Sequence, residues 1–434
     1  MSGAEPENTV VASASSSAQL VDELITAFAE FSEPDSGPGV TRPGYSVLER
    51  KAHDHFTERM TQLGLTVHAD AAGNSIAELP GNEPGLPAIG TGSHLDSVPQ
   101  GGHYDGIAGV VAAMEVARLI VENKTPHRHP LRFVVFAAEE GARFGQACTG
   151  SRIIAGLTAA DDLNDLVDGR GVTVASAMQE IGIDPLRVGD AKWRSKDWCA
   201  FIELHIEQGS VLMDVQLPIG VVDLISGSTR LKITTHGRAS HTGGTPMHLR
   251  ADALTAAAQI VLAAEALAND DEHRGTRITV GRLDVHPASI TTIPGDCEMY
   301  VDIRDVDSDR QRDAATAFIA TAYQIGHDRA VEVGSEILAD ASPVVLPVFV
   351  RNTIVGAVAE MGLGYRVMPS GASHDAQMIN HVVPTGMIFV PSQNHGVSHS
   401  PHELTLTPDI VRGVDALHAS MLALDSSASH AAHD

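Results

Sequence analysis

The chain has 434 residues, which at ~150 residues per domain suits two large domains or about three average ones. Its composition, 43% apolar and 19% charged, excludes a disordered or fibrous chain. With 29 basic and 55 acidic residues the net charge is −26, which disfavours nucleic acid and anionic membranes as partners. The three cysteines are too few and too scattered for a disulfide framework, so a reducing compartment fits best.

No targeting or membrane segment is expected. Residues 1–18 are small and polar, without a basic region followed by an apolar stretch. The most apolar helical stretch, 253–268, is interrupted by Gln259 and Glu265, too early for a bilayer span. We therefore expect a cytoplasmic protein with frayed ends at residues 1–18 and after Leu424.

In chain order, the first half alternates helices and strands. Helices are expected over residues 21–31, 47–63 and 110–121, and strands over 65–79 (two short ones) and 131–137. The run that begins at Pro87 leads into a further buried strand that ends near His94. The order strand, helix, strand predicts a parallel βαβ unit, so this part is α/β. Because chemistry in such sheets gathers at the carboxyl ends of strands, His94 and Glu139 are candidates for one crevice.

The pattern changes near residue 212. Strands are expected over 219–235, 276–284 and 297–304, and helices over 251–267 and 309–325. The order β-α-β-β-α is typical of a small ferredoxin-like layer. After residue 335 the α/β pattern returns, with a helix over 347–361 and a strand over 385–390. We therefore expect a catalytic domain of residues 1–212 and 331–434, split by an inserted domain of residues 213–330.

Residues 92–110 form the segment richest in polar candidates. His94 and Asp96 alternate at a strand end, where Asp96 could orient the imidazole of His94. Asp105 lies in a glycine-rich turn that could present its carboxylate. The alternative is a polar turn whose aspartate caps the following helix, and the His-x-Asp pattern alone favours that alternative.

Glu139 and Glu140 directly follow a buried apolar strand. Two adjacent acids are costly there unless something stabilises their charge. One could bind a metal while its neighbour acts as a base toward a metal-bound water. A solvated acidic loop is the alternative, and the position at a strand end weakens it.

Two further histidines are ambiguous by themselves. His205 lies in an apolar strand, where a lone histidine is more often a core residue, and His399 lies in a loop that could be exposed surface. Together with the preceding candidates they form a set of imidazole and oxygen ligands without thiolate. That set suits paired Zn²⁺, Mn²⁺ or Co²⁺ bridged by a carboxylate, as in two-metal hydrolases.

Seven motifs follow one another between Gly39 and Glu403. They are Gly-Ser-His-Leu-Asp-Ser-Val with Gly-Gly-His-Tyr-Asp-Gly, Ala-Glu-Glu-Gly-Ala-Arg-Phe, Glu-Leu-His-Ile-Glu-Gln-Gly, His-Thr-Gly-Gly-Thr-Pro-Met, Asp-Ile-Arg, Ser-Gly-Ala-Ser-His-Asp-Ala and Gly-Val-Ser-His-Ser-Pro-His-Glu. In these the chain resembles the M20 metallohydrolases, specifically their N-carbamoyl-L-amino acid hydrolase and allantoate amidohydrolase branch. The resemblance implies a metallopeptidase-like α/β catalytic domain with an inserted ferredoxin-like dimerisation or lid domain, and a homodimer.

The resemblance also implies a role for each candidate. Asp105 would bridge two divalent metals, completed by His94 and His205 at one site and by Glu140 and His399 at the other. Glu139 matches the general base of the family. Relatives that cleave peptides or acyl groups tend to carry a carboxylate where His205 stands, so this histidine marks the branch.

Five further residues match the substrate contacts of the family. Gln208 would contact the amide or ureido group, His241 would stabilise the oxyanion, and His374 would contact the substrate. Arg304 would grip a substrate carboxylate with its planar fork, the alternative being an ion pair with the flanking Asp302 or Asp305. Thr291 stands where the branch usually has asparagine, so the carboxylate is either bound differently or belongs to another substrate.

The leading hypothesis is hydrolysis of a linear C–N bond, most plausibly in an N-carbamoyl-L-amino acid. A hydroxide bridging the metals would attack the carbonyl, and Glu139 would pass its proton to the leaving nitrogen. The alternative is hydrolysis of allantoate or another N-acyl or amide substrate. A non-catalytic metal-binding protein is the remote alternative, disfavoured because neither Glu139 nor any ligand is missing.

Overall fold

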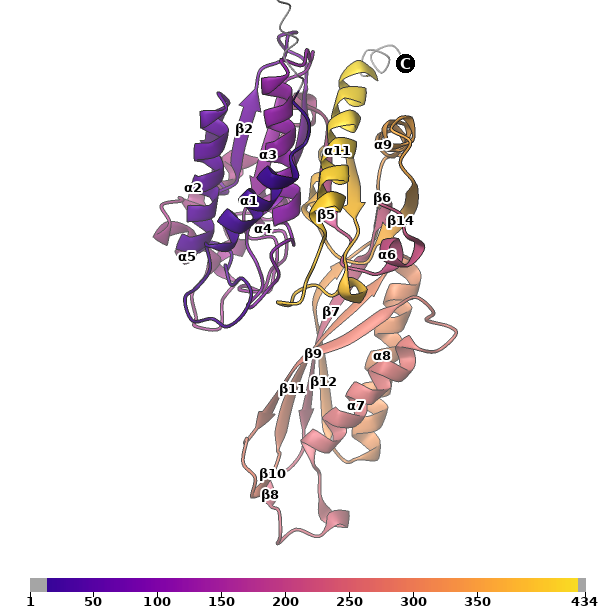
Figure 1. Cartoon of the computed structure of the whole chain (residues 1–434). Coiled ribbons are helices and arrows are strands. Elements are labelled where there is room, and N and C mark those ends of the chain that lie inside the picture. The colour runs from indigo at the N-terminus through magenta and orange to yellow at the C-terminus, as the bar shows by residue number, and fades with distance from the viewer. Residues whose placement is uncertain (1–13, 428–434) are drawn as a thin grey trace, which may run out of the picture. The chain divides into compact units, whose positions relative to one another are not determined.

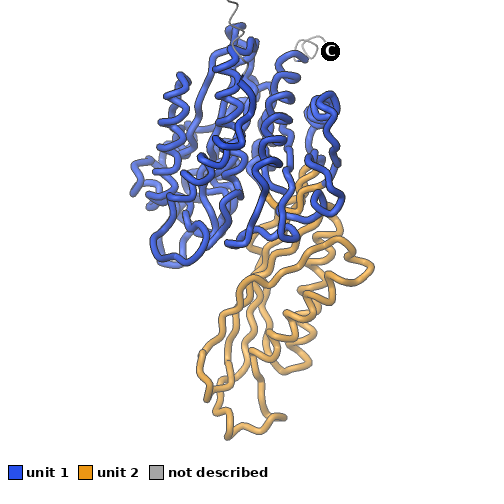
Figure 2. The backbone as a smooth tube through the Cα atoms, viewed as in Figure 1, with its two compact units in different colours: residues 1–223, 346–368, 374–434 blue, residues 224–345, 369–373 orange. Residues whose placement is uncertain are grey.

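The computed structural model describes residues 14–427, which form two compact units (Figure 1). The first unit comprises the described residues up to 223, residues 346–368 and those from 374 on, and the second comprises residues 224–345 and 369–373 (Figure 2). This division differs from the predicted insertion of residues 213–330. The difference arises because β6 (Ile219–Ile225) begins in the sheet of the first unit, while β12 (Glu332–Ala341) completes the sheet of the second.

One mixed sheet forms the centre of the first unit. Its strands are β1 (Thr66–Ala69), β2 (Ser75–Leu79), β3 (Ala88–His94), β4 (Leu131–Phe136), β5 (Trp198–Ile206), β15 (Thr385–Val390) and β6, in the spatial order β1-β2-β4-β3-β5-β15-β6. Strands β4, β3, β5 and β15 are parallel, whereas β1, β2 and β6 pair antiparallel. Two short strands, β13 (Val344–Val345) and β14 (Tyr365–Ser370), also pair with β6. The predicted α/β class with parallel strands is confirmed.

Both faces of this sheet are covered, which explains the apolar, β-branched run in β4. Its residues Phe133 and Val135 join one core cluster, and Val134 and Phe136 join the other. The first cluster includes helices α1 (Ala18–Ala29), α2 (Val47–Gln62), α3 (Ile107–Glu122), α9 (Val348–Glu360) and α11 (Thr407–Ser427), and the second includes α4 (Thr149–Ile154), α5 (Val174–Glu180) and α10 (Asp375–Ile379). Strands buried on both faces are typical of parallel α/β sheets.

Apart from the two long helices of the second unit, the other helices in residues 14–427 are short. They are α6 (Val211–Val215) and the 3-10 helices η1 (Asp162–Asn164), η2 (Pro185–Ala191), η3 (Ser195–Asp197), η4 (Met247–Leu249) and η5 (Asn394–Gly396). No helix within residues 14–427 is long and apolar enough to cross a membrane.

The expected fraying at the ends is wrong where the structure describes them. Helix α11 continues to Ser427 because the buried carboxylate of Asp425 accepts hydrogen bonds from the backbone N–H groups of Arg128 (2.9 Å) and His129 (2.8 Å). At the other end, the backbone N–H of Ser17 donates to Glu115 Oε1 at 2.8 Å, and the Ser17 side chain caps α1. Residues 1–13 and 428–434 lie outside the described residues.

The second unit has the β-α-β-β-α-β order of a ferredoxin-like layer. Its elements are β7 (Gly227–His236), α7 (Ala253–Ala268), β9 (Arg277–His286), β11 (Asp296–Asp305), α8 (Ser308–Asp328) and β12, and the antiparallel sheet has the order β12-β7-β11-β9. Both helices pack on the sheet through one core cluster. A separate two-stranded ribbon joins β8 (Ser240–His241) to β10 (Thr292–Ile293).

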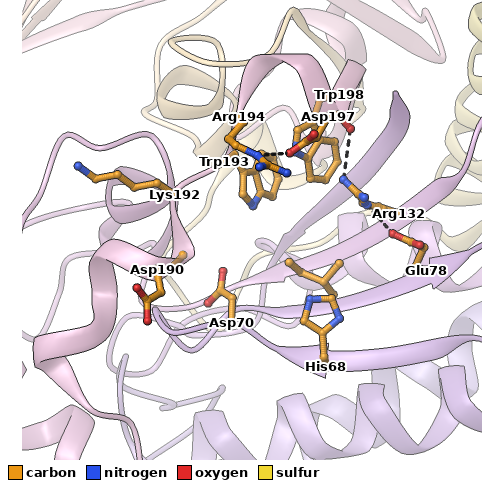
Figure 3. A pocket seen from close by; sticks show the side chains of 12 residues that line it. His68, Asp70, Glu78, Arg132, Asp190, Lys192, Trp193, Arg194, Asp197 and Trp198 are labelled. Atoms are coloured by element: carbon orange, nitrogen blue, oxygen red, sulfur yellow. Dashed lines mark hydrogen bonds and ion pairs between the residues drawn. The ribbon is translucent and has the colours of Figure 1, made fainter. Parts of the chain in front are cut away.

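A cavity of about 420 Å³ lies at the amino ends of the parallel strands of the first unit (Figure 3). Arg132 near the start of β4 and Trp198 at the start of β5 line it, together with Trp193. The two indole rings stack with their centroids 3.8 Å apart, and Arg132 Nε lies 2.7 Å from Glu78 Oε2. The cavity therefore lies at the strand ends opposite to those at which His94 and Glu139 were expected to meet.

Candidate metal centre and active site

The carboxyl ends of β4, β3 and β5 bring together the residues that the motifs singled out. His94 is the last residue of β3, His205 is next to last in β5, and Glu139 follows the end of β4 by three residues. Because these three strands are adjacent and parallel, their ends meet at one edge of the sheet. The two residues do lie close together: His94 Nε2 is 3.7 Å from Glu139 Oε2, and both residues are buried.

Asp105, in the turn before α3, lies between two groups of ligands. Its Oδ1 is 3.1 Å from His205 Nε2 and 3.7 Å from His94 Nε2, and its Oδ2 is 3.3 Å from His399 Nε2. His399 Nε2 is in turn 3.1 Å from Glu140 Oε2. Two triads therefore share Asp105, and within each triad the potential ligand atoms lie within 4.8 Å of one another. The first is His94, Asp105 and His205, and the second is Asp105, Glu140 and His399.

This donor set fits divalent metal ions. Within residues 14–427 the ion pairs of Asp105, Glu139 and Glu140 involve histidines and neither lysine nor arginine, so buried negative charge is left without a fixed cation. Burial opposes a charge on His205, yet the hydrogen bond to Asp105 raises the pKa of His205 to about 9. The site attracts positive charge, and imidazole and carboxylate ligands suit Zn²⁺, Mn²⁺ or Co²⁺.

The histidine rings are held by their second nitrogen atoms. His94 Nδ1 lies 3.3 Å from Asp96 Oδ1, and His205 Nδ1 lies 2.9 Å from the carbonyl oxygen of Ile206. Both rings therefore turn Nε2 toward Asp105, the arrangement that metal-binding histidines usually have. Asp96 also accepts the backbone N–H groups of Glu139 (2.9 Å) and Glu140 (3.1 Å). Asp96 thus ties the two acidic residues to the His94 ring.

The adjacent acids Glu139 and Glu140 differ in their surroundings. Glu140 belongs to a ligand triad, whereas Glu139 belongs to neither triad. Burial raises the pKa of the Glu139 carboxyl to about 7, with the charges of Glu140 and Asp96 adding to the effect and His94 opposing it. A carboxyl group that titrates near neutrality can both accept and return a proton.

Two acidic residues that the motif analysis passed over support the ligands. Glu403 Oε1 accepts the backbone N–H of Asp105 at 3.0 Å, and its Oε2 accepts the Ser398 hydroxyl at 2.6 Å. Glu203 forms a third possible group with His205 and His374, but its oxygens already accept hydrogen bonds from the Ser93 hydroxyl and the Ala376 N–H. Glu203 alternates with His205 on an apolar strand. An acidic residue in such a strand is the sequence feature that could have indicated its supporting role.

Two predicted substrate contacts of the first unit lie beside this cluster. Gln208 Nε2 donates to Asp105 Oδ2 at 2.7 Å and to Ser398 Oγ at 3.3 Å, and its buried Oε1 accepts no hydrogen bond within the described part of the chain. The His374 ring is buried and lies edge-on to the His205 ring, with the centroids 4.6 Å apart. The proximity is a fact of the structure, and the substrate roles stay predictions.

His241 and Thr291 lie in the two-stranded ribbon region of the second unit. His241 pairs with Thr292, and the Thr291 carbonyl accepts the backbone N–H of Thr242 at 3.2 Å. His241 Nδ1 accepts the backbone N–H groups of Gly243 and Gly244, each at 3.0 Å. These two bonds assign the proton to Nε2. The exposed His241 ring therefore presents an N–H donor to its surroundings.

Arg304 is near the last residue of β11, whereas the ribbon adjoins the first residue of this strand. Asp296, the first residue of this strand, lies eight residues before Arg304, which is about 27 Å of extended chain. Thr291 precedes Asp296 by five residues and lies at the ribbon, which adjoins the start of β11. Thr291 and Arg304 of one chain are therefore too far apart to hold one small carboxylate together, and the predicted pairing of the two residues stays a prediction.

The alternative interpretation of Arg304 is partly realised. Its Nε donates to Asp302 Oδ2 at 2.7 Å, whereas Asp305 pairs with Arg310. Arg304 Nη1 makes a long contact of 3.5 Å with the carbonyl oxygen of Gly371, three residues before His374. The Nη side of the guanidinium therefore remains available for a carboxylate.

Two triads that share Asp105, with Glu139 outside both, form a candidate metal site. Residues 90–423 match peptidase family M20/M25/M40, and the chain belongs to this family. It is 38% identical to an N-carbamoyl-L-amino-acid amidohydrolase of Paenarthrobacter aurescens, over 94% of this chain and 98% of that protein. It is 33% identical to an allantoate amidohydrolase of Escherichia coli, over 92% of this chain and 96% of that protein. The family assignment and the amidohydrolase class of enzyme, both predicted from the motifs, are confirmed.

The fold is also that of a solved relative. The crystal structure of AtUAH in complex with glyoxylate is similar with a TM-score of 0.89 and 33% sequence identity. The similarity covers 96% of this chain and 99% of that one. The similarity therefore extends over residues of both units.

Proposed function

We propose that the chain hydrolyses the carbamoyl C–N bond of an N-carbamoyl-L-amino acid and releases the amino acid, carbon dioxide and ammonia. The observation that carries this proposal is the pair of triads around Asp105 with Glu139 left outside both. The similarity to a carbamoyl amino acid amidohydrolase supports the choice of substrate.

We infer that the chain binds two divalent metals. His94, Asp105 and His205 would hold one, and Asp105, Glu140 and His399 the other. Bound there, the metals would polarise the carbamoyl carbonyl and activate the attacking water. Asp96, through its contacts with His94 and the Glu139 and Glu140 N–H groups, keeps these side chains in place.

Glu139 accepts the proton of the attacking water and delivers it to the leaving nitrogen. Its place outside the triads and its raised pKa suit this exchange. Gln208 Oε1, which is buried and lacks a donor among the described residues, accepts an N–H of the ureido group. His374 contacts the substrate from beside His205.

The second unit supplies the remaining contacts. His241 donates its Nε2–H to the developing oxyanion, because its Nδ1 is already an acceptor. Arg304 binds the substrate carboxylate through its Nη atoms. Since about 27 Å of β11 separates Arg304 from the ribbon end, one small substrate cannot touch His241 and Arg304 of the same chain.

We therefore propose a homodimer in which the ribbon of one protomer serves the substrate of its partner. The exposed edge strands β9 and β12 offer pairing surfaces. Mixing His241→Ala with Glu139→Gln protomers tests this arrangement. Activity well above either variant alone is expected, because each mixed dimer contains one complete site. Absence of complementation, or an active monomer in light scattering, would contradict it.

Allantoate, or another N-acyl or amide substrate, is the second candidate. Thr291 in place of the asparagine of the branch favours it, because a hydroxyl offers fewer contacts to a carboxylate. A non-catalytic metal-binding role is disfavoured, since both triads and Glu139 are present. The free cysteines Cys148, Cys199 and Cys297 support a reducing, cytoplasmic location.

Ammonia release across a substrate panel, together with metal analysis, tests the function. The panel contains N-carbamoyl-L-amino acids, allantoate, N-acyl amino acids and uncharged amides. We expect about two metals per chain and the highest kcat/KM on N-carbamoyl-L-amino acids. Higher kcat/KM on allantoate would establish the second candidate, and metal binding without turnover of any member would establish the non-catalytic one.

A further inference from the structure

The loop that follows the two adjacent acids returns to Glu139. Three successive backbone N–H groups, of Cys148, Thr149 and Gly150, donate to the carbonyl oxygens of Glu139, Ala138 and Ala137 at 2.6, 2.9 and 2.9 Å. The segment that carries Glu139 is therefore held to the segment that begins α4. This places the Cys148 side chain beside Glu139.

The thiol of Cys148 also reaches the Glu139 side chain directly. Cys148 Sγ donates to Glu139 Oε1 at 3.1 Å, and both residues are buried, with exposed fractions of 1% and 6%. Glu139 Oε2 is the oxygen that lies 3.7 Å from His94 Nε2. The two oxygens thus have different neighbours: the thiol contacts Oε1, and His94 lies near Oε2.

The thiol keeps its proton in this setting. Burial raises the pKa of Cys148 well above its ordinary value, and the negative charge of Glu139 adds to the effect. A protonated thiol is a donor, which is what a carboxylate partner needs. Cys148 therefore acts as a fixed donor to Glu139.

The backbone conformation at Cys148 is one that disfavours any side chain. Its φ of +59° is in the left-handed region, where glycine is accommodated without steric cost and other residues are disfavoured. A side chain at such a position has a steric cost, and strained positions of this kind cluster at functional sites. The only polar group that this residue adds over glycine is the thiol that contacts Glu139.

We propose that Cys148 is a positioning residue for catalysis, whose S–H group holds the Glu139 carboxylate with Oε2 directed toward the metal ligands. This inference rests on the proposed role of Glu139 as the proton acceptor. Cys148 does not touch the substrate in this scheme. Its effect is on the orientation of Glu139 and so on the chemical step.

Three variants test the proposal in the full-length, metal-loaded enzyme. Cys148→Ala removes the donor, and Cys148→Ser replaces it with a hydroxyl donor. As a control, Cys199→Ala removes a different, half-buried thiol, which lies on β5. We expect Cys148→Ala to lower kcat about 5- to 10-fold, the size of one lost hydrogen bond, with KM and metal content unchanged. Cys148→Ser should recover most of the loss, and Cys199→Ala should match the wild type.

A double-mutant cycle separates positioning from a general structural effect. In the Glu139→Gln background, Cys148→Ala should cause little further loss, because the carboxylate that it positions is absent. Infrared spectroscopy provides a readout without turnover: the S–H stretch of Cys148 should lie at lower frequency than that of Cys199 and move up in Glu139→Gln. Unchanged kcat in Cys148→Ala, an equal loss in both backgrounds, or an unshifted S–H band would overturn the proposal.

The same measurements separate this inference from the proposed function. Near-normal turnover in Glu139→Gln alone would remove the proton-transfer role of Glu139 and with it the basis of the proposal. Inactive Glu139→Gln combined with a fully active Cys148→Ala would reject only the role of Cys148. A lower metal content in Cys148→Ala would show a structural role in place of positioning.

Discussion

The two ends of the parallel strands in the first unit differ in how their charges are compensated. At the amino ends, the cavity is lined by ion pairs such as Arg132 with Glu78 and Arg194 with Asp197 (Figure 3). At the carboxyl ends, the ion pairs of the buried Asp105 and Glu140 carboxylates within residues 14–427 are with histidines only. Each of the ion pairs at the amino ends is neutral as a pair, whereas the arrangement at the carboxyl ends calls for added positive charge. Uncompensated charge, more than the presence of a cavity, distinguishes the end of this sheet that carries the candidate metal site.

The largest effect is expected for the shared ligand of the two triads. Asp105→Ala should bring the metal content from about two per chain toward zero and abolish ammonia release, because both triads lose an oxygen. Chelation of the wild type should have the same effect, reversible by Mn²⁺, Co²⁺ or Zn²⁺. Asp197→Ala, from the amino end, is the matched control and should retain metal and turnover. Two retained metals in Asp105→Ala would break the contrast between the two ends.

The next effect separates the two adjacent acids. Glu139→Gln should keep both metals and lower kcat ~10²–10⁴-fold, since an amide cannot accept the proton. His205→Ala and His399→Ala should instead weaken metal retention. Elemental analysis and steady-state kinetics measure both. Glu78→Gln serves as the control at the amino ends of the strands. If Glu139→Gln had the same kcat as Glu78→Gln, the role of general base would have to be assigned to another residue.

A smaller effect is expected for the arginine of the second unit. Arg304→Ala should raise KM about 10- to 100-fold for carboxylate substrates, as expected for a lost charge-assisted hydrogen bond. Matched amides without the carboxylate should be little affected, and Arg132→Ala should leave KM unchanged. Thr291→Asn should improve turnover of ordinary N-carbamoyl-L-amino acids. An equal loss on acids and uncharged analogues would make Arg304 a structural partner of Asp302.

The smallest effect concerns stability and pH. Burial raises the pKa of Glu49, beside the carboxyl ends, to about 8, with the charge of Asp96 adding to the shift. Between pH ~4.5 and 8 the unfolded chain loses this proton while the folded chain keeps it, so the stability contributed by Glu49 is lost as pH rises. Melting curves of the wild type and Glu49→Gln should therefore diverge over this range, with the wild type losing more. Parallel curves would show that Glu49 ionises normally.

Local sequence patterns predicted the elements that carry the site. The apolar run 131–137 predicted β4, which the structure bounds at Leu131–Phe136, and the strand predicted at residues 385–390 has the same bounds as β15. These patterns are sufficient because a strand buried on both faces needs apolar residues at every position, whatever it packs against. The ordered motifs likewise identified every member of the two triads before their geometry was known.

Only the tertiary structure decided which residues meet. Glu403 accepts the backbone N–H of Asp105, although the two residues are 298 positions apart in the chain. No local sequence pattern encodes such a contact. The opposite positions of Thr291 and Arg304 follow from the length of β11. Periodicity in a sequence reports which side of an element is buried, whereas distances between elements depend on packing of the whole chain. The members of the two triads were therefore readable from the sequence, whereas the residues that support them, the unit boundaries and the separation of Thr291 from Arg304 were not.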